Sequence, residues 1–179
     1  DHLLIASAAD CQKGYYESLQ AQVVASGIDF LWQPLVPFSW RKLIQWELDL
    51  ARSYPTALIA FCDSWDMLFM GSRKEFEEVV GAQPLLLHAE KLCWPHPEKA
   101  ALYPPSSSPW RYVNGTGPAG SGKAIAEAIE YGLANFPIRD DSADVFDVSK
   151  DNDQRFWTDV YLDGHGTLDT GCRLSQSLV

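Results

Sequence analysis

One stretch in the middle of the chain, residues 58–69, constrains the fold more than any other. It reads LIAFCDSWDMLF: five apolar or small residues, four residues that include two aspartates, then three apolar residues. A short apolar run that ends at a polar break is typical of a buried strand in an α/β sheet. Asp63 and Asp66 therefore follow the carboxyl end of a predicted strand, which is where open α/β sheets bind ligands.

Two carboxylates three residues apart indicate a cation site. Asp63 and Asp66 are expected to repel each other unless positive charge lies between them. Hard oxygen ligands of this kind suit Mg²⁺ or Mn²⁺, and substrate phosphates commonly complete the coordination of these ions. The same D-x-x-D spacing also fits a solvated turn in which Asp63 caps a helix, and the motif alone leaves both interpretations open.

The rest of the chain alternates between strand and helix patterns. Apolar runs predict strands at residues 3–9, 28–32, 58–62, 84–89, 110–113, 145–148 and 167–174. Amphipathic spacing and helix-capping signals predict helices at residues 13–26, 41–54, 72–81, 123–133 and 154–162. This alternation predicts an α/β fold in which helices flank a Rossmann-type, mostly parallel sheet.

Size and composition fit a single domain over residues 1–179. The apolar content of 46% is that of a globular chain, and no apolar run approaches the ~20 residues that span a bilayer. The net charge of −10 argues against broad electrostatic binding to nucleic acid. The four cysteines are widely separated, so neither a zinc site nor a disulfide framework is indicated.

A glycine-rich segment, residues 117–123, matches the first seven positions of a Walker A phosphate loop. It lies between a predicted strand and a predicted helix, as such a loop requires. However, the eighth position, which should carry a hydroxyl for Mg²⁺, is Ala124. We keep a P-loop-like nucleotide-binding ATPase as the alternative function, beside a simple turn that opens a helix.

Several motifs, taken in order, resemble one family. They are AFCDSWDMLF at 60–69, HAEKLCWP at 88–95, Tyr103-Pro104, RYVNGTGPAG at 111–120, DNDQRFWT at 151–158, YLD at 161–163 and LD at 168–169. Together they resemble the glycosyltransferase domain of the procollagen lysyl hydroxylase family and its collagen glycosyltransferase-like relatives. The resemblance covers most of the chain. It implies a GT-A type fold, a UDP-sugar donor, and Mn²⁺ or Mg²⁺ as the cofactor.

The resemblance also assigns roles on the donor side of the site. Asp63 and Asp66 take the place of the metal-binding acids, and Trp65 replaces a tyrosine that stacks on the uracil. The other residues expected to contact the donor are Lys42, Ser64 and Asn114. The loop that begins at Asn114 departs from the family pattern, because Gly115 replaces a serine.

On the acceptor side, the resemblance points to Trp94 and to the acidic cluster that contains Asp151 and Asp153. An acceptor hydroxyl needs a base or an in-line approach past the leaving group, and Glu90, Asp153 and Asp151 are the candidate carboxylates. Three of these residues have a structural alternative: Glu90 fits a salt bridge at a strand end, Asp153 fits a helix N-cap, and Trp94 fits the core.

The sequence therefore predicts a metal-dependent glycosyltransferase that moves a hexose from a UDP-sugar to a hydroxyl acceptor. The acceptor is either hydroxylysine in a collagen-like protein or a hydroxymethylated base in DNA, and no membrane partner is expected. Asn114-Gly115-Thr116 is also a glycosylation sequon, and a glycan there would obstruct the site, which slightly favours a cytoplasmic location. In the family, a histidine beyond the last LD motif also binds the metal, so we expect the native protein to continue past Val179. The oligomeric state stays open.

Overall fold

The computed structural model describes residues 2–139 and 151–176, and the strand predicted at 145–148 lies outside them. The described elements are β1 (Leu3–Ala9), α1 (Tyr16–Ala25), β2 (Asp29–Pro34), α2 (Trp40–Ser53), β3 (Leu58–Phe61), α3 (Arg73–Val80), β4 (Leu85–Glu90), η1 (Pro97–Leu102), β5 (Tyr112–Ser121), α4 (Gly122–Asn135), α6 (Asp153–Leu162) and β6 (Thr167–Leu168). Strands and helices alternate along most of the chain, as predicted.

A six-stranded sheet with the order β2-β1-β3-β5-β4-β6 forms the centre of the fold. The pairs β1–β2, β1–β3 and β4–β6 are parallel, whereas β5 runs antiparallel to both of its neighbours. The α/β class and the mostly parallel, Rossmann-type sheet are therefore confirmed.

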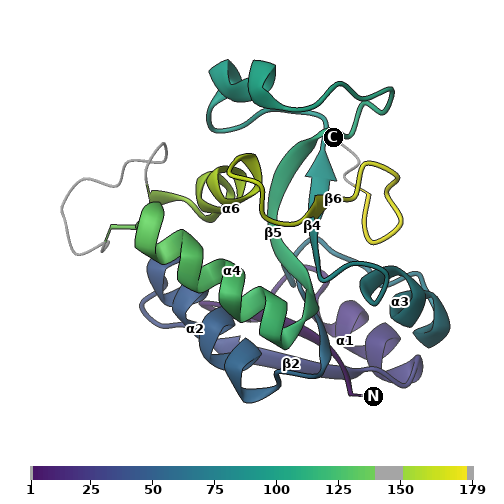
Figure 1. The fold of residues 1–179 in the computed structure, drawn as a ribbon. Coiled ribbons are helices and arrows are strands. Elements are labelled where there is room, and N and C mark those ends of the chain that lie inside the picture. Colours follow the sequence, from purple (N-terminus) through teal and green to yellow (C-terminus); the bar gives the residue numbers. More distant parts are fainter. Residues whose placement is uncertain (1, 140–150, 177–179) are drawn as a thin grey trace.

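Helices cover both faces of this sheet (Figure 1). Apolar side chains of α2, α4 and α6 share one hydrophobic core, and those of α1 and α3 share the other. Strand β3 contributes to both cores, because Ile59 and Phe61 belong to the first and Ala60 to the second. This period-two division is what a strand buried on both faces requires, and it explains the continuous apolar run of the sequence.

The Walker-like segment is not a phosphate loop. Residues 117–121 belong to β5, where Gly120 pairs with Ile59 on one side and with Leu85 on the other. A Cβ on Gly120 would lie 2.2 Å from the carbonyl oxygen of Pro84, so this glycine allows two strands to approach closely. Lys123 lies on the surface of α4, where it pairs with Glu127 at 3.8 Å. The ATPase alternative therefore has no structural support.

The last predicted strand is also wrong beyond its first two residues. Strand β6 stops at Leu168, and the Asp169 carboxylate accepts hydrogen bonds from the backbone N–H groups of Arg173 at 3.0 Å and Leu174 at 2.6 Å. The chain therefore turns around this buried carboxylate and does not continue along the sheet. In the described part of the chain, no helix combines the length and apolar character needed to cross a membrane.

Candidate active site

The candidate site lies where the chain leaves β1 and β3, beside the first turn of α6. Asp63 and Glu47 of α2 line a narrow recess together with Ser7 of β1 and with Gly115 and Thr116 of β5. The recess has room for about one water molecule. A Cβ on Gly115 would lie 3.2 Å from an Asp153 carboxylate oxygen, so the start of α6 closes the other side of Gly115.

Several carboxyl groups converge here and raise one another's pKa values. Asp63 reaches the surface, yet partial burial of its carboxyl, together with the charge of Asp66, raises its pKa to about 7. Burial and the nearby charge of Asp63 raise the pKa of Asp153 well above its ordinary value. The pKa of Glu47 is also raised well above its ordinary value, first by burial and then by the charges of Asp153 and Asp63. Such shifts arise when like charges share a poorly solvated site, and a bound cation would reverse them.

Three buried polar side-chain atoms lie at the same edge of the sheet. Ser7 Oγ, Ser64 Oγ and Glu47 Oε2 are buried and lack a hydrogen-bond partner among the residues that the structure describes. Leaving such groups unpaired is costly, so native structures rarely do so without a reason. Ser7 and Glu47 line the recess itself, and Ser64 follows Asp63 directly. Together they indicate a place for a polar ligand.

Trp65 is fixed against the loop between β1 and α1. Its indole Nε1 donates to the Cys11 carbonyl at 2.9 Å, and its own carbonyl accepts from the Tyr15 N–H at 2.8 Å. The Lys13 ammonium lies 3.4 Å from the centroid of its ring. These contacts replace the first turn predicted for the helix at 13–26, which begins only at Tyr16.

Glu90 lies at the end of β4, within a network of side-chain amides. Asn114 Nδ2 donates to its carboxylate at 3.1 Å, and Gln154 Nε2 donates to its other oxygen and to the Val113 carbonyl. Partial burial raises the pKa of Glu90, and the two amides oppose that shift. Among the described residues Glu90 forms no salt bridge, so its structural alternative is not borne out.

Asp153 belongs to this group, but not as a helix cap. The N-cap of α6 is Asn152, whose side chain accepts from the Arg155 N–H at 3.2 Å, and Asp153 is the first residue of the helix. The expected alternative role of Asp153 as N-cap is therefore wrong. Its buried carboxyl instead lies beside Gly115 and within the field of Asp63.

Three residues that were predicted to belong to the site, Asp151, Lys42 and Trp94, have contacts or exposure that do not place them at the recess. Both Asp151 carboxylate oxygens accept hydrogen bonds from the Arg139 guanidinium, at 2.8 and 2.7 Å. The Lys42 ammonium donates to the Pro37 carbonyl at 2.9 Å, although its helix also carries Glu47. Trp94 lies in the segment between β4 and β5 and is 43% exposed, so it is not a core residue. The roles of these residues stay predictions.

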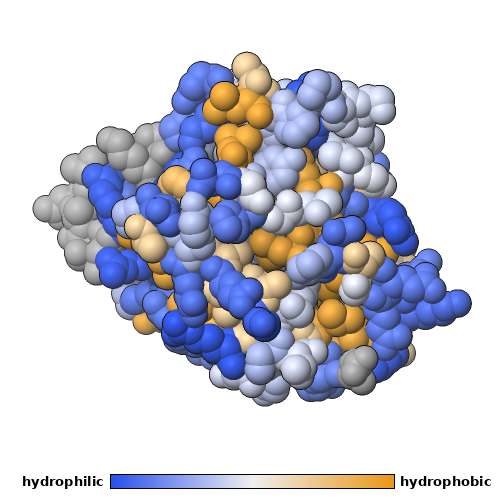
Figure 2. Space-filling model, viewed as in Figure 1, coloured by the Kyte–Doolittle hydropathy of each residue, from blue (hydrophilic) through white to orange (hydrophobic). Residues whose placement is uncertain are grey.

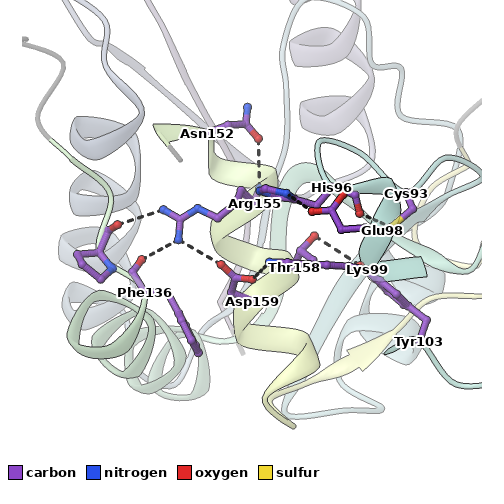
Figure 3. A network of polar contacts seen from close by, with 11 residues as sticks. Cys93, His96, Glu98, Lys99, Tyr103, Phe136, Asn152, Arg155, Thr158 and Asp159 are labelled. Atoms are coloured by element: carbon purple, nitrogen blue, oxygen red, sulfur yellow. Dashed lines mark hydrogen bonds and ion pairs between the residues drawn. The ribbon is translucent and has the colours of Figure 1, made fainter. Parts of the chain in front are cut away.

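The segment between β4 and β5, which carries Trp94, is anchored to α6 (Figure 3). Lys99 of η1 contacts the Asp159 carboxylate, and Arg155 bridges from Asp159 to the carbonyls of Phe136 and Pro137 after α4. Tyr103 contacts Thr158 through its hydroxyl at 3.5 Å. Apolar side chains gather over η1 on the visible face of the molecule (Figure 2), and Leu102 there is 66% exposed.

Reasoning from the sequence missed Glu47, Ser7, Gln154 and Lys13. One of them had a detectable signal: Glu47 lies three residues after Ile44 and four before Ala51, both fully buried, so it places a charge on the core-facing side of α2. The other three have ordinary local patterns, and only their spatial neighbours distinguish them.

The donor set fits a substrate-assisted metal site better than a closed metal cage. Within residues 2–139 and 151–176, no three His, Cys, Asp or Glu side chains are grouped closely enough to hold an ion. Asp63 and Asp66 interact electrostatically and follow β3 directly. One or two carboxylates completed by substrate phosphates are the usual protein ligands of Mg²⁺. The residues present therefore fit a divalent ion that binds together with a phosphate-bearing substrate.

Comparison with known proteins gives a consistent result. A family model described as "PLOD GT domain" matches residues 41–178. The chain is 32% identical over 108 residues to the "Multifunctional procollagen lysine hydroxylase and glycosyltransferase LH3" of Homo sapiens, which is 59% of this chain and 13% of that protein. The protein of the same name from Rattus norvegicus is 30% identical over 119 residues, 65% of this chain and 14% of that protein. The matched part of the chain is thus a small fraction of the length of these relatives.

Proposed function

We propose, since this chain belongs to the family of PLOD glycosyltransferase domains, that it transfers a hexose from a UDP-sugar to a hydroxyl acceptor with the help of Mn²⁺ or Mg²⁺. Membership of the family establishes a glycosyltransferase domain. The donor, the metal and the acceptor are our proposal.

One observation carries the proposal: carboxyl groups and unpartnered polar atoms converge at the end of β3. Asp63 and Asp66 would hold the cation, and Ser7 and Ser64 would hydrogen-bond a polar ligand beside it. When bound, a divalent cation offsets the negative charge that develops on a departing diphosphate. A nucleoside diphosphate supplies phosphate oxygens that can complete the coordination of the cation and polar groups that can hydrogen-bond to the serine hydroxyls.

We assign Glu90 as the group that accepts the proton of the acceptor hydroxyl. As the hydroxyl oxygen bonds to the anomeric carbon, the bond from that carbon to the UDP oxygen breaks, and the proton passes to the Glu90 carboxylate. Asn114 and Gln154 hold this carboxylate in one orientation, which is what a general base requires. Asp153 is the second candidate because its buried carboxyl lies beside Gly115, which lines the same recess as Asp63.

The acceptor is proposed from the names of the relatives and from the exposed segment between β4 and β5. The relatives are called procollagen lysine hydroxylases and glycosyltransferases, so a hydroxylysine side chain is the first choice. Exposed Trp94 and Leu102 offer apolar contacts to a polypeptide near the site. The net charge of −10 makes hydroxymethylated DNA the second choice.

The test is a donor and acceptor screen that follows UDP release in the presence of Mn²⁺. We expect turnover with at least one UDP-hexose, and we expect Asp63→Asn and Asp66→Asn each to abolish it and to weaken Mn²⁺ binding. Asp49→Asn, an exposed acid on α2, is the matched control. Turnover only with a nucleotide sugar that carries another base would correct the donor. Full activity in Asp63→Asn would refute the metal assignment.

A further inference from the structure

A lysine outside the predicted site covers the indole of Trp65. Lys13 belongs to the loop between β1 and α1, and its ammonium lies 3.4 Å from the centroid of the ring. Trp65 itself lies between Asp63 and Asp66 in the chain. A base that stacks on the Trp65 ring would therefore come into contact with Lys13.

The main chain sets the position of Lys13. Contacts on both sides of this residue, from Cys11 and Tyr15, join the loop to Trp65. Gly14 has a φ of +61°, and a Cβ there would lie 2.0 Å from the Trp65 carbonyl oxygen, so the loop fits against Trp65 only with glycine at this position. Lys13 is thus presented to the ring by two interlocked segments.

The Lys13 ammonium lacks an acidic partner within residues 2–139 and 151–176. No carboxylate of the described chain lies within ion-pair distance of it, whereas Lys74, Lys99 and Lys123 each pair with one. Lys42 and Lys91 form no ion pair with a described carboxylate either, so what distinguishes Lys13 is its place over the ring of Trp65. Lys13 is also exposed, and cation–π contacts at exposed sites are weak, so the ammonium can leave the ring at little cost.

We infer that Lys13 is a donor-binding residue whose ammonium contacts the diphosphate of the bound nucleotide. The inference rests on the proposed function and deepens it, because it adds a cation to a site whose recess is lined by the acids Glu47 and Asp63. The ligand class is a nucleoside diphosphate. Its anionic phosphates attract the ammonium, and its base can stack on the ring of Trp65. Lys13 rests on the ring when no donor is bound and moves to the phosphates when one is.

The test compares UDP with uridine by titration calorimetry in the presence of Mn²⁺. Uridine keeps the base and ribose but lacks the phosphates, so it isolates the contact with Trp65. We expect Lys13→Met to weaken UDP binding about tenfold, the loss of one charge-assisted hydrogen bond, and to leave uridine binding unchanged. Lys13→Arg retains most of the affinity for UDP, and Lys123→Met, an exposed lysine on α4, changes neither ligand.

The other outcomes separate this inference from the proposed function. The deficit of Lys13→Met should shrink between about 50 mM and about 500 mM NaCl, because salt screens exposed charges. Equal losses for UDP and uridine would mean that Lys13 acts only through the ring, and unchanged UDP affinity would mean that it does not act; either result overturns the inference alone. Wild-type protein that binds no UDP with Mn²⁺ present would overturn the proposed donor, and the inference with it.

Discussion

The Asn114 side-chain amide donates a hydrogen bond to the Glu90 carboxylate at 3.1 Å, joining the end of β4 to β5 beside the acidic centre. We predict that Glu90→Gln, which keeps the shape and loses the base, lowers kcat by about 10²- to 10⁴-fold with little change in the KM for donor. Asn114→Ala should cost less, because Gln154 still holds the carboxylate. Steady-state kinetics on both variants test this. Wild-type kcat in Glu90→Gln, alongside an equally active Glu98→Gln control, would exclude Glu90 as the base.

Trp65 and Trp94 should differ in what they bind. We predict that Trp65→Ala weakens UDP binding by roughly 1–3 kcal/mol, the range for a base stacked on an aromatic ring, and that Trp65→Tyr has a mild effect. Trp94→Ala should leave UDP binding unchanged and raise the KM for acceptor, since Trp94 lies on the exposed segment before η1. Calorimetry with UDP measures the first effect. Equal UDP affinity in Trp65→Ala and wild type would remove this ring from the site.

Replacing Lys99 and replacing Asp159, the two partners of the ion pair that anchors η1, should lower the unfolding free energy by different amounts. Lys99→Met leaves Asp159 paired with Arg155 at 3.2 Å, whereas Asp159→Asn leaves two cations without their shared carboxylate. We predict losses of unfolding free energy of about 1 kcal/mol for Lys99→Met and about 2–3 kcal/mol for Asp159→Asn. Lys123→Met should cost less than about 0.5 kcal/mol, because the side chains of its pair are 74% and 65% exposed. Urea unfolding decides the order, and a larger loss in Lys99→Met would contradict it.

His88 should make the fold less stable in mild acid. It is buried in β4 with Nδ1 in contact with Ser175 Oγ, and burial lowers its pKa from 6.5 to about 4 against the opposing charge of Asp169. Between these values the unfolded chain takes up a proton that the folded chain does not, so unfolding free energy falls as pH falls from about 6.5 to about 4. The full loss approaches about 3 kcal/mol.

Urea unfolding of wild type and His88→Gln across this pH range isolates the effect of the imidazole from that of the acids. The variant should lose less stability than wild type on acidification. Identical pH dependence in the two proteins would show that His88 is protonated in the folded state as readily as in the unfolded one.

Gly120 should be needed for packing and not for phosphate binding. Its φ is +153°, and an added Cβ would meet the Pro84 carbonyl oxygen at 2.2 Å. We predict that Gly120→Ala lowers the unfolding free energy by about 2–3 kcal/mol. Gly27→Ala, also at positive φ but with no atom within 4 Å of the added Cβ, should cost only about 1 kcal/mol. Equal losses would mean that backbone strain alone, and not the contact between strands, requires glycine at 120.

The sequence by itself was sufficient to predict those features that depend on residues close together in the chain. The apolar run at Leu58–Phe61 predicted a buried strand, and the helix predicted at 72–81 begins with a capping box formed by Ser72 and Glu75. Both patterns depend on local periodicity and on hydrogen bonds that close within one turn. The order of several motifs likewise indicated the glycosyltransferase domain family, which the match over residues 41–178 confirms.

Tertiary structure decided everything that depends on distances between separate segments. The glycine-rich segment matched a phosphate loop by its letters, but pairing with β3 and β4 makes it a strand, and no window of sequence contains those partners. Glu47, Asp63 and Asp153 come from three separate segments of the chain, so their charges interact only after folding brings them together. The same holds for Lys13 and Trp65, which lie far apart in the chain although the Lys13 ammonium is 3.4 Å from the centroid of the Trp65 ring. Burial and Coulomb interactions act through space, and the local sequence specifies neither of them.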